Sequence, residues 1–487
     1  MNSAVDLPLG LSEFSFRAAG DALVRRSVLP SGVRVLSEQV PGSRSATIGF
    51  WVAVGSRDEH AAGVLAPGAP ASFGSTHFLE HLLFKGTSER TALDIAVAFD
   101  AVGGEHNALT AKEYTCYYAK VQDRDLDMAV GVLADMFTSS LLDPAEFENE
   151  RGVILEELSM AGDDPADVAS ERFFQAVLGE HPLGRPIGGD PETIGAATRD
   201  AVWAHYRAEY RPQDLVVTVA GAVDHDALVA RLGEVLALAG WNLDDVAPPV
   251  ARRDRGPADI RRGAPLVVTQ RPTEQVNLLL GMPALVATDE RRSTMSVLNA
   301  VFGSGMSSRL FQEIRERRGL AYAVYSFSPA YSDAGVFGMY AGCAPGKASS
   351  VAELMLAELH RVAEHGITEL ELSRAAGQLG GASALALEDS DTRMSRLGRS
   401  ELTLGEFVDL DEALRRIARV TADDVQALAA ELVGQPLSLS AVGAIDDDVF
   451  ASIRAELDRE PGAARTAAPP GAAAEPQHPT APTPVVS

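Results

Sequence analysis

Residues 74–84 read GSTHFLEHLLF, an apolar run that carries two histidines and one glutamate, His77, Glu80 and His81. Most of the other positions from His77 onward are apolar, which predicts a short helix buried on most of its sides. Polar groups are costly to bury unless they are paired. The three polar side chains are therefore predicted to be paired with one another or bound to a ligand.

The spacing of these residues suits a zinc ion. His77 and His81 are four residues apart and project from one helical face, with Glu80 beside them. Two imidazoles at this spacing can bind Zn²⁺, and a neighbouring carboxylate can take a proton from a zinc-bound water. The order H-x-x-E-H inverts the more common zinc motif H-E-x-x-H. A short motif also arises by chance, so a pair of core or surface histidines is the alternative.

The composition is that of an ordinary globular protein with more than one domain. The chain has 487 residues, of which 46% are hydrophobic and 23% charged, and this length predicts two to four domains. The net charge of −26 argues against a nucleic-acid partner. We expect no secretory signal and no membrane partner, because neither a leader pattern nor a bilayer-length apolar run is found. Cys116 and Cys343 are predicted to be buried free thiols, and the predicted location is cytoplasmic.

The predicted elements occur twice in the same order. The first set comprises an apolar strand, the motif helix, a strand pair, two long helices and a closing strand, at 46–55, 77–84, 106–110, 114–121, 125–141, 144–161 and 215–221. The matching segments of the second set are 275–282, 293–302, 322–327, 335–343, 351–364, 369–387 and 437–443. This order predicts a duplicated α+β unit of roughly 200 residues. The second copy of the motif helix contains no histidine or glutamate.

Changes in composition predict the domain boundaries. A polar, proline-bearing linker is expected at 243–264. It separates a catalytic zinc-binding domain at 25–242 from an inactive homologous domain at 265–458. An N-terminal lead-in, poorly ordered as far as residue 20, is expected at 1–24, and a disordered Ala/Pro-rich tail at 459–487.

Several motifs together resemble the insulinase/pitrilysin family of zinc peptidases, most closely the branch of mitochondrial processing peptidase and its bacterial relatives. In the first half they are HxxEH at 77–81, FKGT at 84–87, NAxT at 107–110, ER with VILEE at 150–157, and HPLGRP at 181–186. In the second half they are GSGMSSRLF at 303–311 and the segment at 315–322. The resemblance covers most of the chain, and it is specific because independent motifs occur in the right order.

This resemblance implies the rest of the metal site. The family's third ligand is a glutamate about 76 residues beyond the second histidine, which matches Glu157, and Glu150 matches a second acid that supports the site without binding the metal. One Zn²⁺ per chain is thus implied, held by His77, His81 and Glu157. Glu80 is implied as the general base on zinc-bound water, and the implied reaction is hydrolysis of peptides or unfolded segments.

The resemblance also implies how substrate and partner are held. Asn107 and Ala108 match an exposed edge strand that pairs with the peptide as an added strand. Arg315 and Tyr322 match an arginine and a tyrosine of the inactive half that contact substrate near the scissile carbonyl. The implied fold is two homologous α/β-sandwich domains, with helices packed on mixed sheets, forming half of a clam-shell. Two chains complete the chamber, so a homodimer acting on peptides is expected. The loop at 61–74 is longer than in relatives and is a candidate for altering access.

Other functions remain as alternatives. The main one is a non-catalytic partner subunit of a peptidase-like complex, and the intact Glu80 and Glu157 argue against it. A zinc hydrolase of another class, such as a deaminase, requires a Cys-x-x-Cys pair that two isolated cysteines cannot form. A structural or binding protein with a chance motif is disfavoured by the separate match at Glu157.

Overall fold

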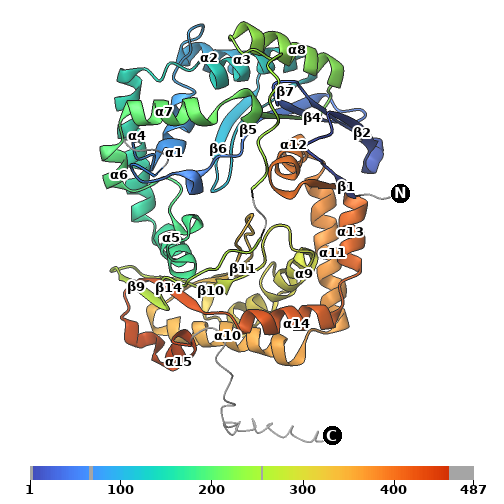
Figure 1. The fold of residues 1–487 in the computed structure, drawn as a ribbon. Helices are drawn as coiled ribbons and strands as arrows, with labels where there is room; N and C mark the ends of the chain where they lie inside the picture. The colour runs from blue at the N-terminus through green and yellow to red at the C-terminus, as the bar shows by residue number, and fades with distance from the viewer. Residues whose placement is uncertain (1–3, 65–69, 254–255, 460–487) are drawn as a thin grey trace, which may run out of the picture.

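Two halves, one above the other in Figure 1, make up the computed structural model, which describes residues 4–64, 70–253 and 256–459. The sheet of the first half contains, in spatial order, β2 (Glu13–Arg17), β3 (Leu23–Val28), β4 (Arg34–Gln39), β8 (Val216–Gly221), β5 (Ser45–Val52), β7 (Thr115–Gln122) and β6 (Glu105–Thr110). The sheet of the second half contains β11 (Ala321–Phe327), β12 (Val336–Cys343), β10 (Val276–Pro283), β14 (Ser438–Gly443) and β9 (Leu266–Gln270). Helices pack on both mixed sheets, which confirms the predicted α+β class.

The two sheets repeat one topology, as the duplicated order of elements predicts. In the first half β4 runs parallel to β8, and β5 runs antiparallel to both β8 and β7. In the second half β9 runs parallel to β14, and β10 runs antiparallel to both β14 and β12. The strands β6 and β11 therefore occupy equivalent edges of their sheets.

The helices of the two halves also follow a matching order. Those of the first half are α1 (Ser75–Leu82), α2 (Ala92–Asp100), α3 (Leu126–Ser139), α4 (Pro144–Asp163), α5 (Pro165–Leu178), α6 (Pro191–Ala196), α7 (Arg199–Glu209) and α8 (His225–Leu238). Those of the second half are α9 (Arg292–Phe302), α10 (Ala348–His365), α11 (Glu369–Ala386), α12 (Ser390–Arg399), α13 (Leu410–Ala418), α14 (Ala422–Val433) and α15 (Arg454–Leu457). Each half has its own main hydrophobic core.

Two helices are exchanged between the halves. Helix α5 follows α4 in sequence but packs on β10 and β14 of the second sheet, where Phe173 lies in a cluster with Leu279. Helix α12 follows α11 but packs on β5 and β8 of the first sheet, where Met394 lies in a cluster with Trp51. The second face of each apolar sheet is thus covered by a helix of the opposite half, which removes both faces from water.

The N-terminal segment differs from the expected lead-in. Strand β1 (Ala4–Asp6) pairs with β13 (Glu406–Val408) of the second half, and β2 pairs with β3 at the edge of the first sheet. For residues 4–20 the expectation of poor order is therefore wrong. Phe14 and Phe16 alternate along β2, and the Phe16 ring lies 5.2 Å from that of Phe407. Burial of this aromatic face holds the segment in place.

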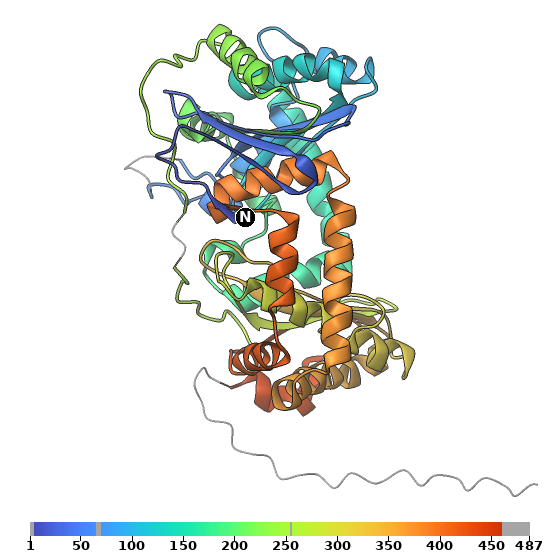
Figure 2. The same ribbon diagram turned by 90° about the vertical axis from the view of Figure 1, so that its right-hand side faces the viewer.

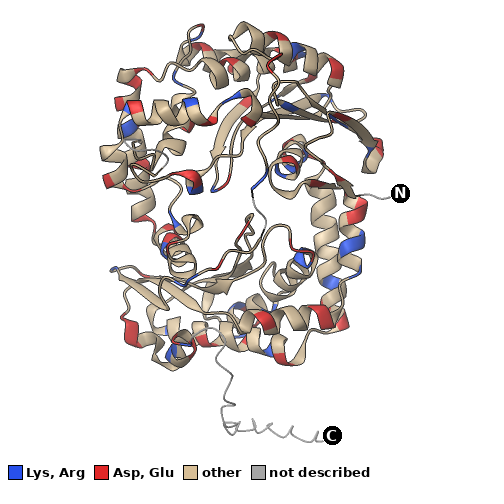
Figure 3. Ribbon diagram, in the orientation of Figure 1, with Lys and Arg blue, Asp and Glu red and all other residues tan. Residues whose placement is uncertain are grey.

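Buried charges join the halves. Glu401, fully buried, lies 3.0 Å from Arg26 and 3.5 Å from Arg34 of the first sheet. Glu38, also buried, pairs with Arg393 and Arg396 of α12. Because unpaired buried charges are strongly unfavourable, these pairs fix how α12 and the segment after it sit on the first sheet. The chain has 68 acidic and 42 basic residues, and both kinds are spread along the two halves (Figure 3).

The described parts of the connection from α8 to β9, residues 239–253 and 256–265, lie along one side of the molecule between the first half and the second (Figure 2). This segment includes the linker predicted at 243–264. Within it Arg253 pairs with Asp58, and Ala247 N donates to Pro30 O. The chain boundaries proposed for the domains stay a prediction, and the tail predicted at 459–487 lies outside the described residues apart from Arg459. Among the described helices, none is both long and apolar enough to cross a membrane.

Candidate metal centre

Helix α1 carries the H-x-x-E-H motif. Phe78, Leu79 and Leu82 are fully buried in the core of the first half. This packing leaves His77 and His81 on the other face, with side chains that are 18% and 15% exposed. The apolar pattern of the run thus forms the helix and also aims its two histidines away from the core.

A buried carboxylate holds the start of α1. Gly74, with a φ of 80°, precedes the helix, and its N–H and that of Thr76 each donate to Glu59 at 2.9 Å. Burial raises the pKa of Glu59 to about 7, although these backbone hydrogen bonds lower it. Glu59 therefore satisfies N–H groups that a helix leaves unpaired at its first turn, and it closes the base of the loop at 61–74.

Helix α4 supplies the acids that face α1. Asp143 caps it by accepting from the N–H groups of Ala145 and Glu146, and Pro144 begins it. The ring of Phe147 stacks on that of Phe78 with centroids 4.6 Å apart. This contact sets α4 against α1, so that Glu150 and Glu157, two turns apart, both lie beside the histidines.

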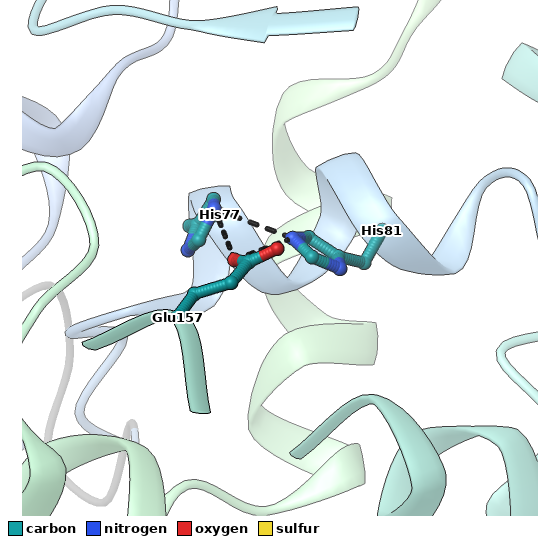
Figure 4. A group of neighbouring side chains, drawn as sticks. All are labelled: His77, His81 and Glu157. Atoms are coloured by element: carbon teal, nitrogen blue, oxygen red, sulfur yellow. Dashed lines mark hydrogen bonds and ion pairs between the residues drawn. The ribbon is translucent and has the colours of Figure 1, made fainter. Parts of the chain in front are cut away.

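Three ligand atoms converge between α1 and α4 (Figure 4). The Nε2 atoms of His77 and His81 lie 3.3 Å apart. Oε2 of Glu157 lies 3.8 Å from Nε2 of His77 and 3.4 Å from Nε2 of His81. Among the described residues, these three side chains form the one group of histidines, cysteines and acids that is close enough to hold a metal ion.

The distances fit a tetrahedral metal site. Ligand atoms about 2.05 Å from a shared tetrahedral centre lie about 3.3 Å from one another. The two histidines have this separation, and Glu157 is within about 0.5 Å of it. Two nitrogens and one oxygen form the kind of donor set that catalytic zinc sites use, with a fourth position open to water or substrate.

A hydrogen bond at Nδ1, the nitrogen that does not face the ligand group, orients the ring of His81. Its Nδ1 lies 2.9 Å from Oε2 of Glu150, and Oε1 of Glu150 lies 2.8 Å from Nζ of Lys85. Burial raises the pKa of the Glu150 carboxyl, but the hydrogen bonds from Lys85 and His81 outweigh it, and the net pKa lies below the usual value. A negatively charged Glu150 accepts a hydrogen bond from the Nδ1–H of His81, which leaves the lone pair of Nε2 available to a metal.

His77 and Glu80 complete the motif. Burial, with a smaller contribution from the charge of His81, lowers the pKa of His77, which favours the neutral imidazole that a metal requires. Glu80 is half-buried and lies outside the group of three ligands. Among the described residues its side chain forms no hydrogen bond or ion pair, so its carboxylate is available to accept a proton.

The residues implied for substrate binding lie on the two equivalent edge strands. Asn107 and Ala108 are on β6, and Oδ1 of Asn107 accepts from the N–H of Ala108 at 2.8 Å. Tyr322 is on β11 and is 75% exposed. The guanidinium of Arg315 lies 4.8 Å from the centre of the Tyr322 ring, a cation–π contact. The structure thus brings Arg315 and Tyr322 together in the second half.

Sequence reasoning missed two residues of this region. Lys85 lies in the FKGT motif, but the family resemblance assigns it no role, and Glu59 belongs to none of the motifs. A lysine just after a helix and an acid before a loop usually lie in solvent, so neither shows a local signal. Their partners, Glu150 and the N–H groups of α1, are close only in the folded chain.

Comparisons with known proteins identify the family of the chain. The model of the insulinase family, peptidase family M16, matches residues 34–191, and that of the peptidase M16 inactive domain matches residues 196–379. The fold and the metal-ligand group thus define a protein of the zinc-peptidase type. The chain belongs to peptidase family M16, the insulinase family, which confirms the resemblance seen in the sequence.

Bacterial proteins are among the relatives of this chain. An uncharacterized zinc protease of Streptomyces coelicolor is 49% identical over 428 residues, covering 88% of this chain and 91% of the relative. One of Bacillus subtilis is 36% identical over 420 residues, covering 86% and 98%. A protease structure from Helicobacter pylori has a TM-score of 0.76 at 22% identity, covering 86% of this chain and 99% of that one. An M16 inactive-domain structure from Pseudomonas fluorescens has a TM-score of 0.75 at 19% identity, covering 90% and 99%, and both likenesses show the fold.

Proposed function

We propose that this protein is a zinc-dependent endopeptidase that cleaves peptides or unfolded segments. The observation that carries the proposal is the convergence of His77 Nε2, His81 Nε2 and Glu157 Oε2 beside Glu80, whose side chain has no partner among the described residues. The names of the Streptomyces coelicolor and Bacillus subtilis relatives, both uncharacterized zinc proteases, support it. His77, His81 and Glu157 are the ligands of one Zn²⁺ per chain, and Glu80 is the general base.

A zinc ion bound by His77, His81 and Glu157 would act as a Lewis acid on the scissile carbonyl and the attacking water. Glu80, on the same helical face, accepts a proton from that water and passes it to the leaving amine. Glu150 holds the imidazole of His81 through Nδ1, so that the ring keeps its orientation throughout the reaction. The role of α1 is thus to present two ligands and one base at fixed separations.

The proposed substrate site is the open edge of the first sheet. An extended peptide adds to β6 as a further strand, which binds its main chain with little selectivity for side chains. The N–H of Ala108 is held by the side chain of Asn107 in the free strand, and a substrate carbonyl replaces that partner. Arg315 and Tyr322 of the second half hydrogen-bond the oxygen on which negative charge develops.

We also propose that two chains associate as a homodimer whose halves enclose the substrate. One chain already contains both the histidine-bearing half and the half with Arg315 and Tyr322, so identical chains suffice. Sedimentation velocity is expected to give twice the mass of the chain. A monomer with full peptidase activity contradicts the dimer.

The alternative is a non-catalytic partner subunit, and Glu80→Gln separates the two functions. The variant is expected to bind zinc as the unmodified protein does, while its kcat on a quenched fluorogenic peptide falls by about a hundredfold or more, because the general base is lost. Glu89→Gln, an exposed acid outside the site, is the matched control. Equal rates for Glu80→Gln and the unmodified protein contradict the assigned base. A zinc-loaded unmodified protein without activity on a peptide library favours the partner subunit.

A further inference from the structure

Glu150 is a buried carboxylate that contacts two side chains, the imidazole of His81 and the ammonium group of Lys85. Its side chain is 4% exposed, and its oxygens have different partners: Oε2 lies 2.9 Å from His81 Nδ1, and Oε1 lies 2.8 Å from Lys85 Nζ. A carboxylate this deeply buried requires charge compensation to stay ionised. Lys85 supplies it, because the neutral imidazole of a metal ligand carries no charge.

The backbone places Lys85 at this spot. Its N–H donates to Leu82 O at 3.1 Å in the turn that ends α1. The next residue, Gly86, has a φ of 121°, which favours glycine, and its carbonyl accepts from the N–H of Leu141 just before α4. The segment after the motif is thus hydrogen-bonded to the residues just before α4, the helix that carries Glu150. This contact holds the backbone of Lys85 in place relative to Glu150.

The ion pair of Lys85 with Glu150 differs from an ordinary surface ion pair in how deeply its acid is buried. Lys120 Nζ lies 2.7 Å from Asp389, and its side chain is 30% exposed, close to the 32% of Lys85. The acid beside Lys120 is 48% exposed, whereas that beside Lys85 is 4% exposed. Water competes for the first pair and is excluded from the acid of the second, so the second contact is the stronger and more directional one.

We propose that Lys85 is a positioning residue of the metal centre, which holds Oε1 of Glu150 so that Oε2 stays against Nδ1 of His81. Nε2 of His81 is then kept facing His77 and Glu157. The inference rests on the proposed function, because it requires that His81 binds the metal. This role requires no contact of Lys85 with the metal or the substrate, because Lys85 acts through Glu150.

Loss of the ammonium group is expected to weaken zinc binding. Without it, the side chain of Glu150 is free to turn toward other donors, and the ring of His81 loses its fixed partner. Partners of this kind typically change metal affinity by about 10- to 100-fold. For Lys85→Met we expect a loss of about tenfold in zinc affinity, while Lys85→Arg, which keeps the charge and the reach, stays within about threefold of the unmodified full-length protein.

The experiment measures the zinc dissociation constant by competition with a fluorescent chelator, for the unmodified full-length protein, Lys85→Met, Lys85→Arg and the matched control Lys120→Met. Thermal unfolding of the zinc-free proteins checks that each is folded. A second comparison uses Glu150→Gln and the double variant Lys85→Met/Glu150→Gln. If Lys85 acts through Glu150, adding Lys85→Met to Glu150→Gln changes the affinity little.

Each outcome bears on one claim. The inference is overturned if Lys85→Met binds zinc as tightly as the unmodified protein, if Lys120→Met weakens binding as much, or if the effect of Lys85→Met persists in the Glu150→Gln background. If Lys85→Met does not fold, Lys85→Arg decides, and a tenfold loss there overturns the inference. If the unmodified protein itself binds no zinc, the proposed function fails instead.

Discussion

The Nε2 atoms of His77 and His81 face each other at 3.3 Å, with their ring planes at 88°. Two protonated imidazoles at this distance repel strongly, and burial together with the charge of His81 lowers the pKa of His77. The pair is therefore suited to share a cation rather than to carry two protons. Glu157 brings a negative charge to the same point.

Glu157 is predicted to be a ligand and its neighbour Glu156 a solvated acid. Glu157→Gln is expected to reduce zinc affinity more than about a hundredfold, because losing a ligand costs more than losing an outer partner. Both acids are exposed, so neither substitution is expected to change the thermal unfolding of the zinc-free protein. Chelator competition on Glu157→Gln and Glu156→Gln compares the two, and equal zinc affinity in the two variants argues against this ligand.

His205, on α7, predicts a pH dependence of stability. Burial lowers its pKa to about 4, and its Nε2 lies 3.4 Å from Oγ1 of Thr76 in α1. The unfolded chain takes up a proton near pH 6.5, whereas the folded protein takes it up only near pH 4. Stability is therefore lost as the pH falls through this window, by about 3 kcal/mol in total from this residue.

Urea unfolding of the zinc-free protein between pH 4.5 and 7.5 checks this. His205→Asn is expected to lower stability at neutral pH but to flatten its slope below pH 6.5. His365→Gln, at an exposed histidine at the end of α10, is the control and should keep the original slope. An unchanged slope in His205→Asn shows that another group causes the loss.

Tyr322 is predicted to act in turnover and not in folding. Tyr322→Phe removes the hydroxyl of a residue that is 75% exposed, and it is expected to lower kcat about tenfold or more, with unfolding unchanged. Tyr325→Phe, on the same strand, removes the hydroxyl of a tyrosine whose ring stacks on that of Tyr340 with centroids 4.8 Å apart, and it should keep kcat. Steady-state kinetics on one peptide compares the variants, and an equal kcat for Tyr322→Phe and the unmodified protein rules out this role.

Much of the site is visible in the sequence because its geometry is local. His77, Glu80 and His81 lie within one helical turn, and the 3.6-residue period fixes their common face. Glu157 has no such local signal, and its selection over Glu156 depended on the family resemblance. Lys85 and Glu59 were missed because each contacts a partner from a distant part of the fold, Glu150 in one case and the first turn of α1 in the other.

The fold, like the site, has features that the sequence predicts and features that only the tertiary structure decides. Alternating and helical patterns predict the strands, the paired order of the two halves and their α+β class, since each depends on neighbours in sequence. Only the tertiary structure decides that α5 covers β10 and β14, that α12 covers β5 and β8, and that β2 extends the first sheet. The pattern of an amphipathic helix or an edge strand predicts that one of its faces is buried. Which surface covers that face depends on the packing of the whole chain, because the helix or strand packs on an apolar surface that no other element covers.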